Sequence, residues 1–71
     1  MEQTLRAEMV ASVHSVVVAV GDEVVVGDTL VILESMKMEM PVEAEEEGTV
    51  AKILVEEGQT VSEGDPVVEL E

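Results

Sequence analysis

The chain contains no cysteine and no aromatic residue, and it has a single histidine among its 71 residues. Without cysteine it can form neither a disulfide nor a thiolate metal site, and the lone His14 argues against a metal cluster built on histidines. We therefore expect no metal site. Without Phe, Tyr or Trp there is no platform on which nucleobases could stack. The stability of so short a chain must come from one compact apolar core.

Positive charge is also scarce. Seventeen acidic residues face three basic ones, which gives a formal net charge of −14. A phosphate backbone would be repelled by this surface, so the composition argues against a nucleic-acid partner. Solubility, or adaptation to a salty cytoplasm, is one explanation of the acidity. Attraction towards basic partner enzymes is the functional explanation, and the two are compatible.

The sequence shows no targeting segment. Its N-terminus lacks a basic stretch followed by an apolar run, and the longest apolar run, residues 16–20, is too short to cross a bilayer. We expect a cytoplasmic protein that does not associate with membranes.

A repeat with a period of 37 residues organises the chain. The pattern Gly-x-x-Val-x-x-Gly-Asp occurs at residues 21–28 and again at residues 58–65. Around it, residues 1–34 resemble residues 38–71, and the tripeptide Ser35-Met36-Lys37 joins the two copies. Two copies are too few for an open solenoid. The sequence therefore predicts one closed domain, residues 1–71, with an approximate twofold axis.

Each copy is typical of short β-strands. The β-branched segments 13–18 and 50–55 are expected to be equivalent strands, with glycines marking the turns between strands. Pro41 and Pro66 must then lie at strand beginnings or edges, because proline cannot donate to a β-ladder. No segment has a helical period. The predicted fold is all-β, a small sandwich or flattened barrel.

The repeat also predicts the position of Lys37. If a twofold axis relates the halves, the hairpin at residues 34–38 lies at one end of the domain and both termini lie at the other. A lysine amine is protonated near neutral pH and needs a base to act as a nucleophile. The chain offers no suitable base nearby, so modification by another enzyme is one interpretation. On spacing alone, a solvated turn lysine flanked by core methionines is the simpler one.

The string Glu34-Ser35-Met36-Lys37-Met38 resembles the Glu-(Ala/Ser)-Met-Lys-Met signature of biotinyl domains, the carriers of biotin-dependent carboxylases. Methionine on both sides of the lysine separates this family from the related lipoyl domains, which typically have Asp-Lys-Ala. The glycine frames on either side of Lys37 agree with the same family. The resemblance spans essentially the whole chain.

This resemblance implies a flattened barrel of two four-stranded antiparallel sheets with quasi-twofold symmetry. It implies biotin joined covalently, by an amide, to Lys37, and attached by biotin protein ligase through biotinyl-adenylate. The chain would then be a carrier without catalytic residues, moving carboxyl groups between biotin carboxylase and carboxyltransferase sites. Met36 and Met38 would contact the ligase or pack over the barrel end. In isolation we expect a monomer.

Three features depart from the family pattern. Ala11 stands where the repeat predicts the glycine found at Gly48, which leaves the turn geometry near Met9–Ser12 open. There is no Pro/Ala-rich linker, so we expect a domain that is not tethered to an enzyme, and no thumb insertion separates the halves. Two alternatives therefore remain: a lipoyl-type carrier, and an acidic interaction module, bare or biotinylated, without a carboxylase role.

Overall fold

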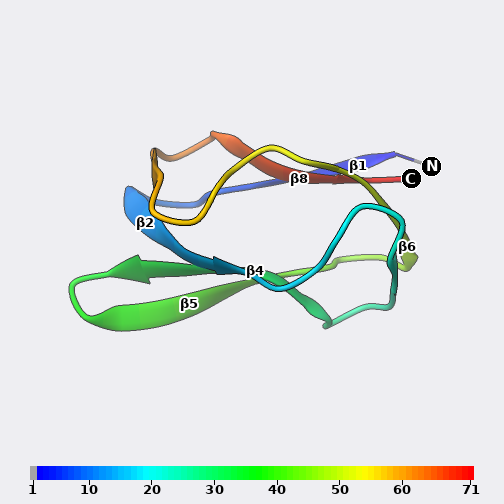
Figure 1. The fold of residues 1–71 in the computed structure, drawn as a ribbon, viewed down its shortest axis with the longest axis horizontal. Coiled ribbons are helices and arrows are strands. Elements are labelled where there is room, and N and C mark those ends of the chain that lie inside the picture. Colours follow the sequence, from blue (N-terminus) through cyan, green and yellow to red (C-terminus); the bar gives the residue numbers. More distant parts are fainter. Residues whose placement is uncertain (1) are drawn as a thin grey trace.

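The computed structural model describes residues 2–71 and consists of β-strands joined by turns and loops (Figure 1). The strands are β1 (Gln3–Arg6), β2 (Ala11–Val16), β3 (Glu23–Val24), β4 (Thr29–Ser35), β5 (Met38–Glu43), β6 (Gly48–Ile53), β7 (Thr60–Val61) and β8 (Pro66–Leu70). Within the described residues no helix is long and apolar enough to span a membrane.

The strands form two antiparallel sheets of four. One has the order β1-β8-β6-β3 and the other the order β5-β4-β2-β7. The sheets face each other across the core, and the domain is elongated (Figure 1). The predicted all-β fold of two four-stranded antiparallel sheets is confirmed.

The two sheets are copies of each other under the sequence repeat. A shift of 37 residues moves β2 onto β6 and β3 onto β7, and it converts the order of one sheet into that of the other. The hydrogen bonds between halves follow the same rule: the Gly21 N–H donates to the Val50 carbonyl at 2.8 Å, and the Gly58 N–H donates to the Val13 carbonyl at 2.8 Å. Each half thus supplies a loop that ties itself to the other half.

The core lies between the sheets and is filled by aliphatic side chains alone. Among the described residues no polar or charged side chain is buried, so no buried charge has to be compensated. Valine suits this core because its stiff side chain packs well on a pleated surface. The largest fully buried side chains are Leu30, Leu70, Val13, Val31, Val50, Val61, Val67 and Val68.

Two boundaries differ from the sequence prediction. The strands expected at 13–18 and 50–55 begin and end two residues earlier, as β2 and β6. The Val17 N–H still donates to the Leu30 carbonyl of β4, and after it the chain crosses towards the other half, where Gly21 is bonded, so the residues that follow Val17 belong to a connection. Ala11 starts β2 just as Gly48 starts β6, so the missing glycine does not move the strand. Pro66 is the first residue of β8 and Pro41 lies in the edge strand β5, as predicted.

Replacing Gly58 with alanine is expected to lower the free energy of unfolding by about 1–3 kcal/mol. Gly58 has a φ of 88°, a backbone conformation that residues other than glycine rarely adopt. Its N–H donates a hydrogen bond to the Val13 carbonyl, which joins the two halves. Chemical denaturation of the variant measures the loss. The exposed neighbour Glu57→Ala is the matched control and should change stability by less than about 0.5 kcal/mol. Equal stabilities for the two variants would contradict the prediction.

Candidate functional site

Lys37 lies in a tight β-hairpin between β4 and β5. Ser35 and Met38 are the last pair of the ladder, so the loop consists of Met36 and Lys37 alone. Both loop residues have positive φ, 52° and 66°. Positive φ at both central positions is the requirement of a type I′ turn, whose twist matches that of the flanking strands. The sequence thus places a lysine at the apex of a two-residue turn on the longest hairpin of the domain.

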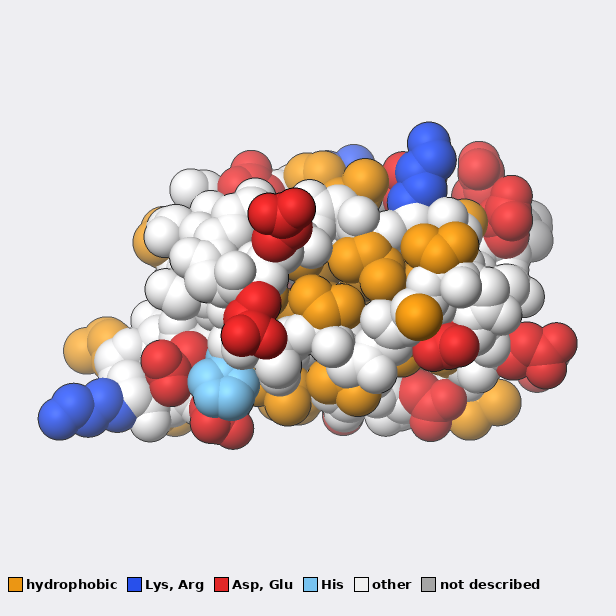
Figure 2. All heavy atoms as spheres, in the orientation of Figure 1, with side chains coloured by type: hydrophobic (Ala, Val, Ile, Leu, Met, Phe, Trp, Pro, Cys, Tyr) orange, Lys and Arg blue, Asp and Glu red, His pale blue; other side chains and the backbone are white. Residues whose placement is uncertain are grey.

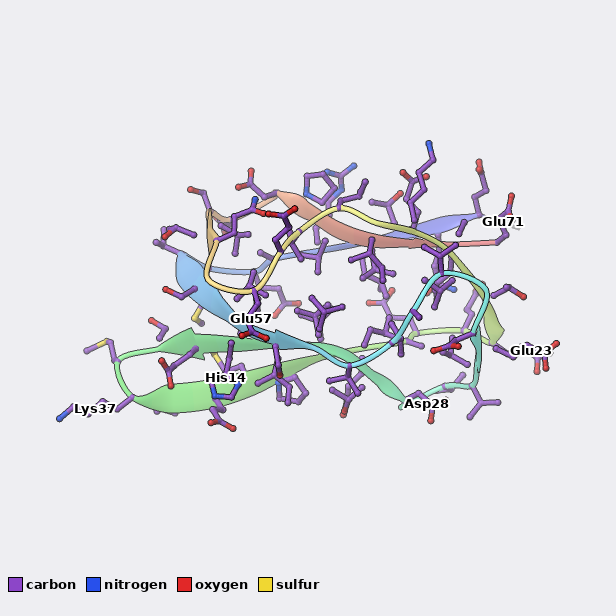
Figure 3. The ribbon with its side chains drawn as sticks, viewed as in Figure 1. His14, Glu23, Asp28, Lys37, Glu57 and Glu71 are labelled. Atoms are coloured by element: carbon purple, nitrogen blue, oxygen red, sulfur yellow. The ribbon has the colours of Figure 1, made fainter. Side chains whose placement is uncertain are left out.

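The Lys37 amine is presented to solvent at one end of the domain. The side chain is exposed and projects away from the ribbon at the tip of the hairpin, while Glu71 lies at the opposite end (Figure 3). No described residue forms a hydrogen bond or an ion pair with this amine. The amine is therefore open to a second protein, and the chain offers no base beside it.

The methionines on either side of the lysine do not pack on the barrel. Met36 is 91% exposed and Met38 is 65% exposed. Met40 is the methionine of β5 that packs against the core. Of the two roles considered for Met36 and Met38, packing over the barrel end is not what the structure shows. Both side chains are exposed next to Lys37 in the sequence, which suits contact with another protein.

A hollow elsewhere on the surface is not part of this tip. It has a volume of about 510 Å³ and lies between the edge strands β1 and β5. Its walls include the segments 4–9 and 40–45, and Lys37 is not among its lining residues. The lysine therefore projects from a convex tip, which is an arrangement for presenting a group and not for enclosing a substrate.

The turn end of the hairpin carries a charged cluster that the sequence did not indicate. Glu34 and Glu39 face each other across β4 and β5, and His14 of β2 places its Nε2 3.4 Å from Glu39 Oε2. This is the only ion pair among residues 2–71. The sequence alone does not reveal this cluster, because the pairing register of β2 on β4 cannot be deduced from the spacing of these residues. The register is irregular at His14.

Replacing Met36 with asparagine is expected to stabilise the domain by about 0.5–1 kcal/mol, since a left-handed conformation costs most residues about 1–2 kcal/mol and asparagine tolerates it. Methionine is not a residue type that this turn favours, so the backbone at Met36 is strained. Backbone strain of this kind is common at functional sites. Thermal and chemical denaturation measure the gain. Met38→Asn, in an extended strand, is the control and should give no stabilisation. A destabilised Met36→Asn variant would show that the turn is not strained.

Comparison with known proteins identifies the relatives of the chain. The family model described as "Biotin-requiring enzyme" matches residues 3–70. The "Biotinylated protein TB7.3 homolog" of Mycobacterium leprae (strain TN) is 52% identical over 65 residues, covering 92% of each chain. The "Biotin/lipoyl attachment protein" of Bacillus subtilis (strain 168) is 40% identical over 67 residues, covering 94% of this chain and 92% of the relative. The crystal structure of Kluyveromyces lactis urea carboxylase contains a similar domain, with a TM-score of 0.94 and 39% identity over all of this chain and 6% of that one.

Proposed function

Because this chain belongs to the biotin-requiring enzyme family and is a biotinyl carrier domain without catalysis of its own, we propose that it carries biotin on Lys37 as a carboxyl carrier. The observation that supports Lys37 is its place at the apex of an exposed hairpin, with its amine unengaged by any described residue. In this role the arm would move carboxyl groups between a biotin carboxylase site and a carboxyltransferase site.

The tip fits covalent attachment of biotin. Lys37 Nζ would attack the activated carboxyl group of biotin, forming an amide and releasing AMP from biotinyl-adenylate. The ammonium must lose its proton first, and since no base of this chain lies beside it, biotin protein ligase would supply one. Met36 and Met38 would give the ligase apolar contacts on both sides of the amine, which their exposure allows.

Biotin would supply the ring that accepts and releases the carboxyl group, and the chain would supply only presentation. The two-sheet barrel holds the hairpin rigid, so that the arm moves with the whole domain. The convex tip offers no pocket that would enclose the arm. A group shared between two active sites requires such an open position.

The partners we propose are the ligase, a biotin carboxylase and a carboxyltransferase. The similar domain in urea carboxylase supports a carboxylase partner. A net charge of −14 would steer the carrier towards basic rims on such enzymes and keep copies of it apart, so we propose a monomer in the cytoplasm.

A lipoyl carrier is the second candidate, and it is kept because the Bacillus subtilis relative is a biotin/lipoyl attachment protein. The methionines that flank Lys37 favour biotin, as the sequence comparison with lipoyl domains indicated. An acidic binding module that keeps its lysine bare, or is biotinylated without serving a carboxylase, is the third candidate.

The intact mass of the chain separates a biotinylated chain, a lipoyl carrier and a module whose lysine stays bare. After incubation with biotin protein ligase, ATP and biotin, we expect the mass to rise by one biotinyl group and the product to bind streptavidin. The same chain offered lipoate and a lipoate ligase should stay unmodified. A lipoyl shift would favour the second candidate. No shift with a ligase that is active on a known carrier would favour the module that keeps its lysine bare.

A further inference from the structure

We propose that His14, Glu34 and Glu39 form a binding site for a divalent transition-metal ion, zinc being the probe, near the turn of the Lys37 hairpin. This goes beyond the carrier function and does not depend on it. It also departs from the expectation drawn from the single histidine, because the site combines one imidazole with two carboxylates.

The geometry brings one ligand atom from each residue together. A histidine ring nitrogen, a Glu34 carboxylate oxygen and a Glu39 carboxylate oxygen all lie within 4.8 Å of one another. Zinc binds such atoms at about 2.0–2.2 Å, so two ligands of one tetrahedral ion lie about 3.4 Å apart. All three side chains are exposed, and rotation about their torsions covers the remaining distance. Three protein ligands with open positions for water are a normal zinc coordination set.

The two carboxylates of the cluster repel each other, and a bound cation would relieve that repulsion. Glu34 and Glu39 lie directly opposite each other on neighbouring strands, an arrangement of like charges that destabilises a sheet. Within residues 2–71 no lysine or arginine forms an ion pair with either carboxylate, and the one cationic partner is the His14 ring when it is protonated. A metal ion would neutralise both carboxylates at once. In Figure 2 the histidine lies among acidic side chains near the end that carries the lysine tip.

The twofold repeat provides an internal comparison. His14 occupies a position where the pairing of β2 with β4 slips by one residue, and Ala51 occupies the matching slip between β6 and β8. The fold therefore builds the same bulge twice, and bulges re-aim side chains. Only the copy beside Lys37 has an imidazole there. The bulge by itself does not require histidine, since alanine serves in the equivalent place.

The ion preferred by this set follows from its chemistry. Imidazole suits zinc, copper and nickel, whereas magnesium prefers oxygen ligands and retains its waters. An ion held by β2, β4 and β5 would tie the turn end of the hairpin to β2. It would also stabilise the folded chain, because the ligands come together only on folding.

Titration of the unmodified 71-residue chain with zinc chloride tests the proposal by calorimetry and by NMR of the histidine ring. His14 is the only histidine, so its ring signals report on this site alone. We expect saturable binding of one zinc per chain, displaced ring signals and a higher melting temperature. A large excess of magnesium should not displace the zinc.

The variants His14→Ala and Glu39→Gln should each weaken zinc binding by about tenfold or more, which corresponds to about 1.4 kcal/mol or more. Glu23→Gln removes the same charge at the opposite end of the domain and should bind zinc like the unchanged chain (Figure 3). Circular dichroism confirms that each variant is folded. Unaltered binding by His14→Ala, an equal loss in Glu23→Gln, or displacement by magnesium would show diffuse attraction to an acidic surface and would overturn the proposal.

Discussion

Replacing Lys37 with arginine is expected to abolish biotinylation, whereas replacing Lys52 with arginine is expected to leave it intact. Arginine keeps the positive charge but stays protonated in proteins, so it cannot attack the activated carboxyl group of biotin. Lys37 and Lys52 are the only lysines of the chain, and both are exposed. The pair therefore separates the effect of position from the effect of losing a lysine.

The structure gives the reason for the difference. Lys37 stands at the apex of the β4–β5 turn with Met36 and Met38 exposed beside it, while Lys52 is a residue within β6. A ligase can surround a side chain at the apex of a turn, whereas it can approach Lys52 only across the face of a sheet in which β6 pairs with β8. Streptavidin blotting and intact mass after ligase treatment measure the outcome. Residual biotin on Lys37→Arg, or its loss from Lys52→Arg, would move the attachment site away from the tip.

Truncating either of two equivalent core leucines is expected to destabilise the domain severely. Leu33 in β4 and Leu70 in β8 are 37 residues apart and are 3% and 0% exposed. A buried Leu→Ala change costs about 2–5 kcal/mol through lost burial and the cavity that remains. At about 0.05–0.15 kcal/mol per residue, a domain of this length has about 4–11 kcal/mol of stability in total. Each single change should therefore remove a large part of it.

Urea denaturation of Leu33→Ala and Leu70→Ala measures both losses, and quasi-twofold symmetry predicts that they are similar. The exposed Val26→Ala is the control and should change stability by less than about 0.5 kcal/mol. If one leucine variant lost several kcal/mol and the other almost none, the two halves would not share the core equally. Retained biotinylation of a folded variant would also show that the core serves the tip only through stability.

The symmetry of the fold does not extend to its chemistry. The corner that carries Lys37 is a continuous hairpin because the chain passes there from one copy to the next. The equivalent corner at the other end is formed by β1 and β8. These are the first and last strands in the sequence, so no turn joins them directly. One repeated scaffold thus yields one tight turn, and Lys37, the exposed methionines and the His14 cluster all lie at that end.

The 37-residue repeat and the valine-rich pattern were sufficient to predict the all-β class, the glycine turns and the location of Lys37 at a joint between copies. These are local or periodic properties, since alternation, glycine and proline act on their own backbone. The strand ends near Val16 and Ile53 were misplaced by two residues, because valine continues beyond the point at which the chain leaves its sheet. Strand propensity alone therefore does not show where the chain leaves its sheet.

Only the tertiary structure decided which side chains meet. Nothing in the spacing of His14, Glu34 and Glu39 shows that they gather, because their proximity depends on the register of β2 against β4 and on the slip at His14. The exposure of Met36 and Met38 likewise depends on how far the hairpin extends beyond the barrel. The sequence determined the repeating strands and the amine at their seam. The surroundings of that amine were decided by strand pairing, which joins residues that are distant along the chain.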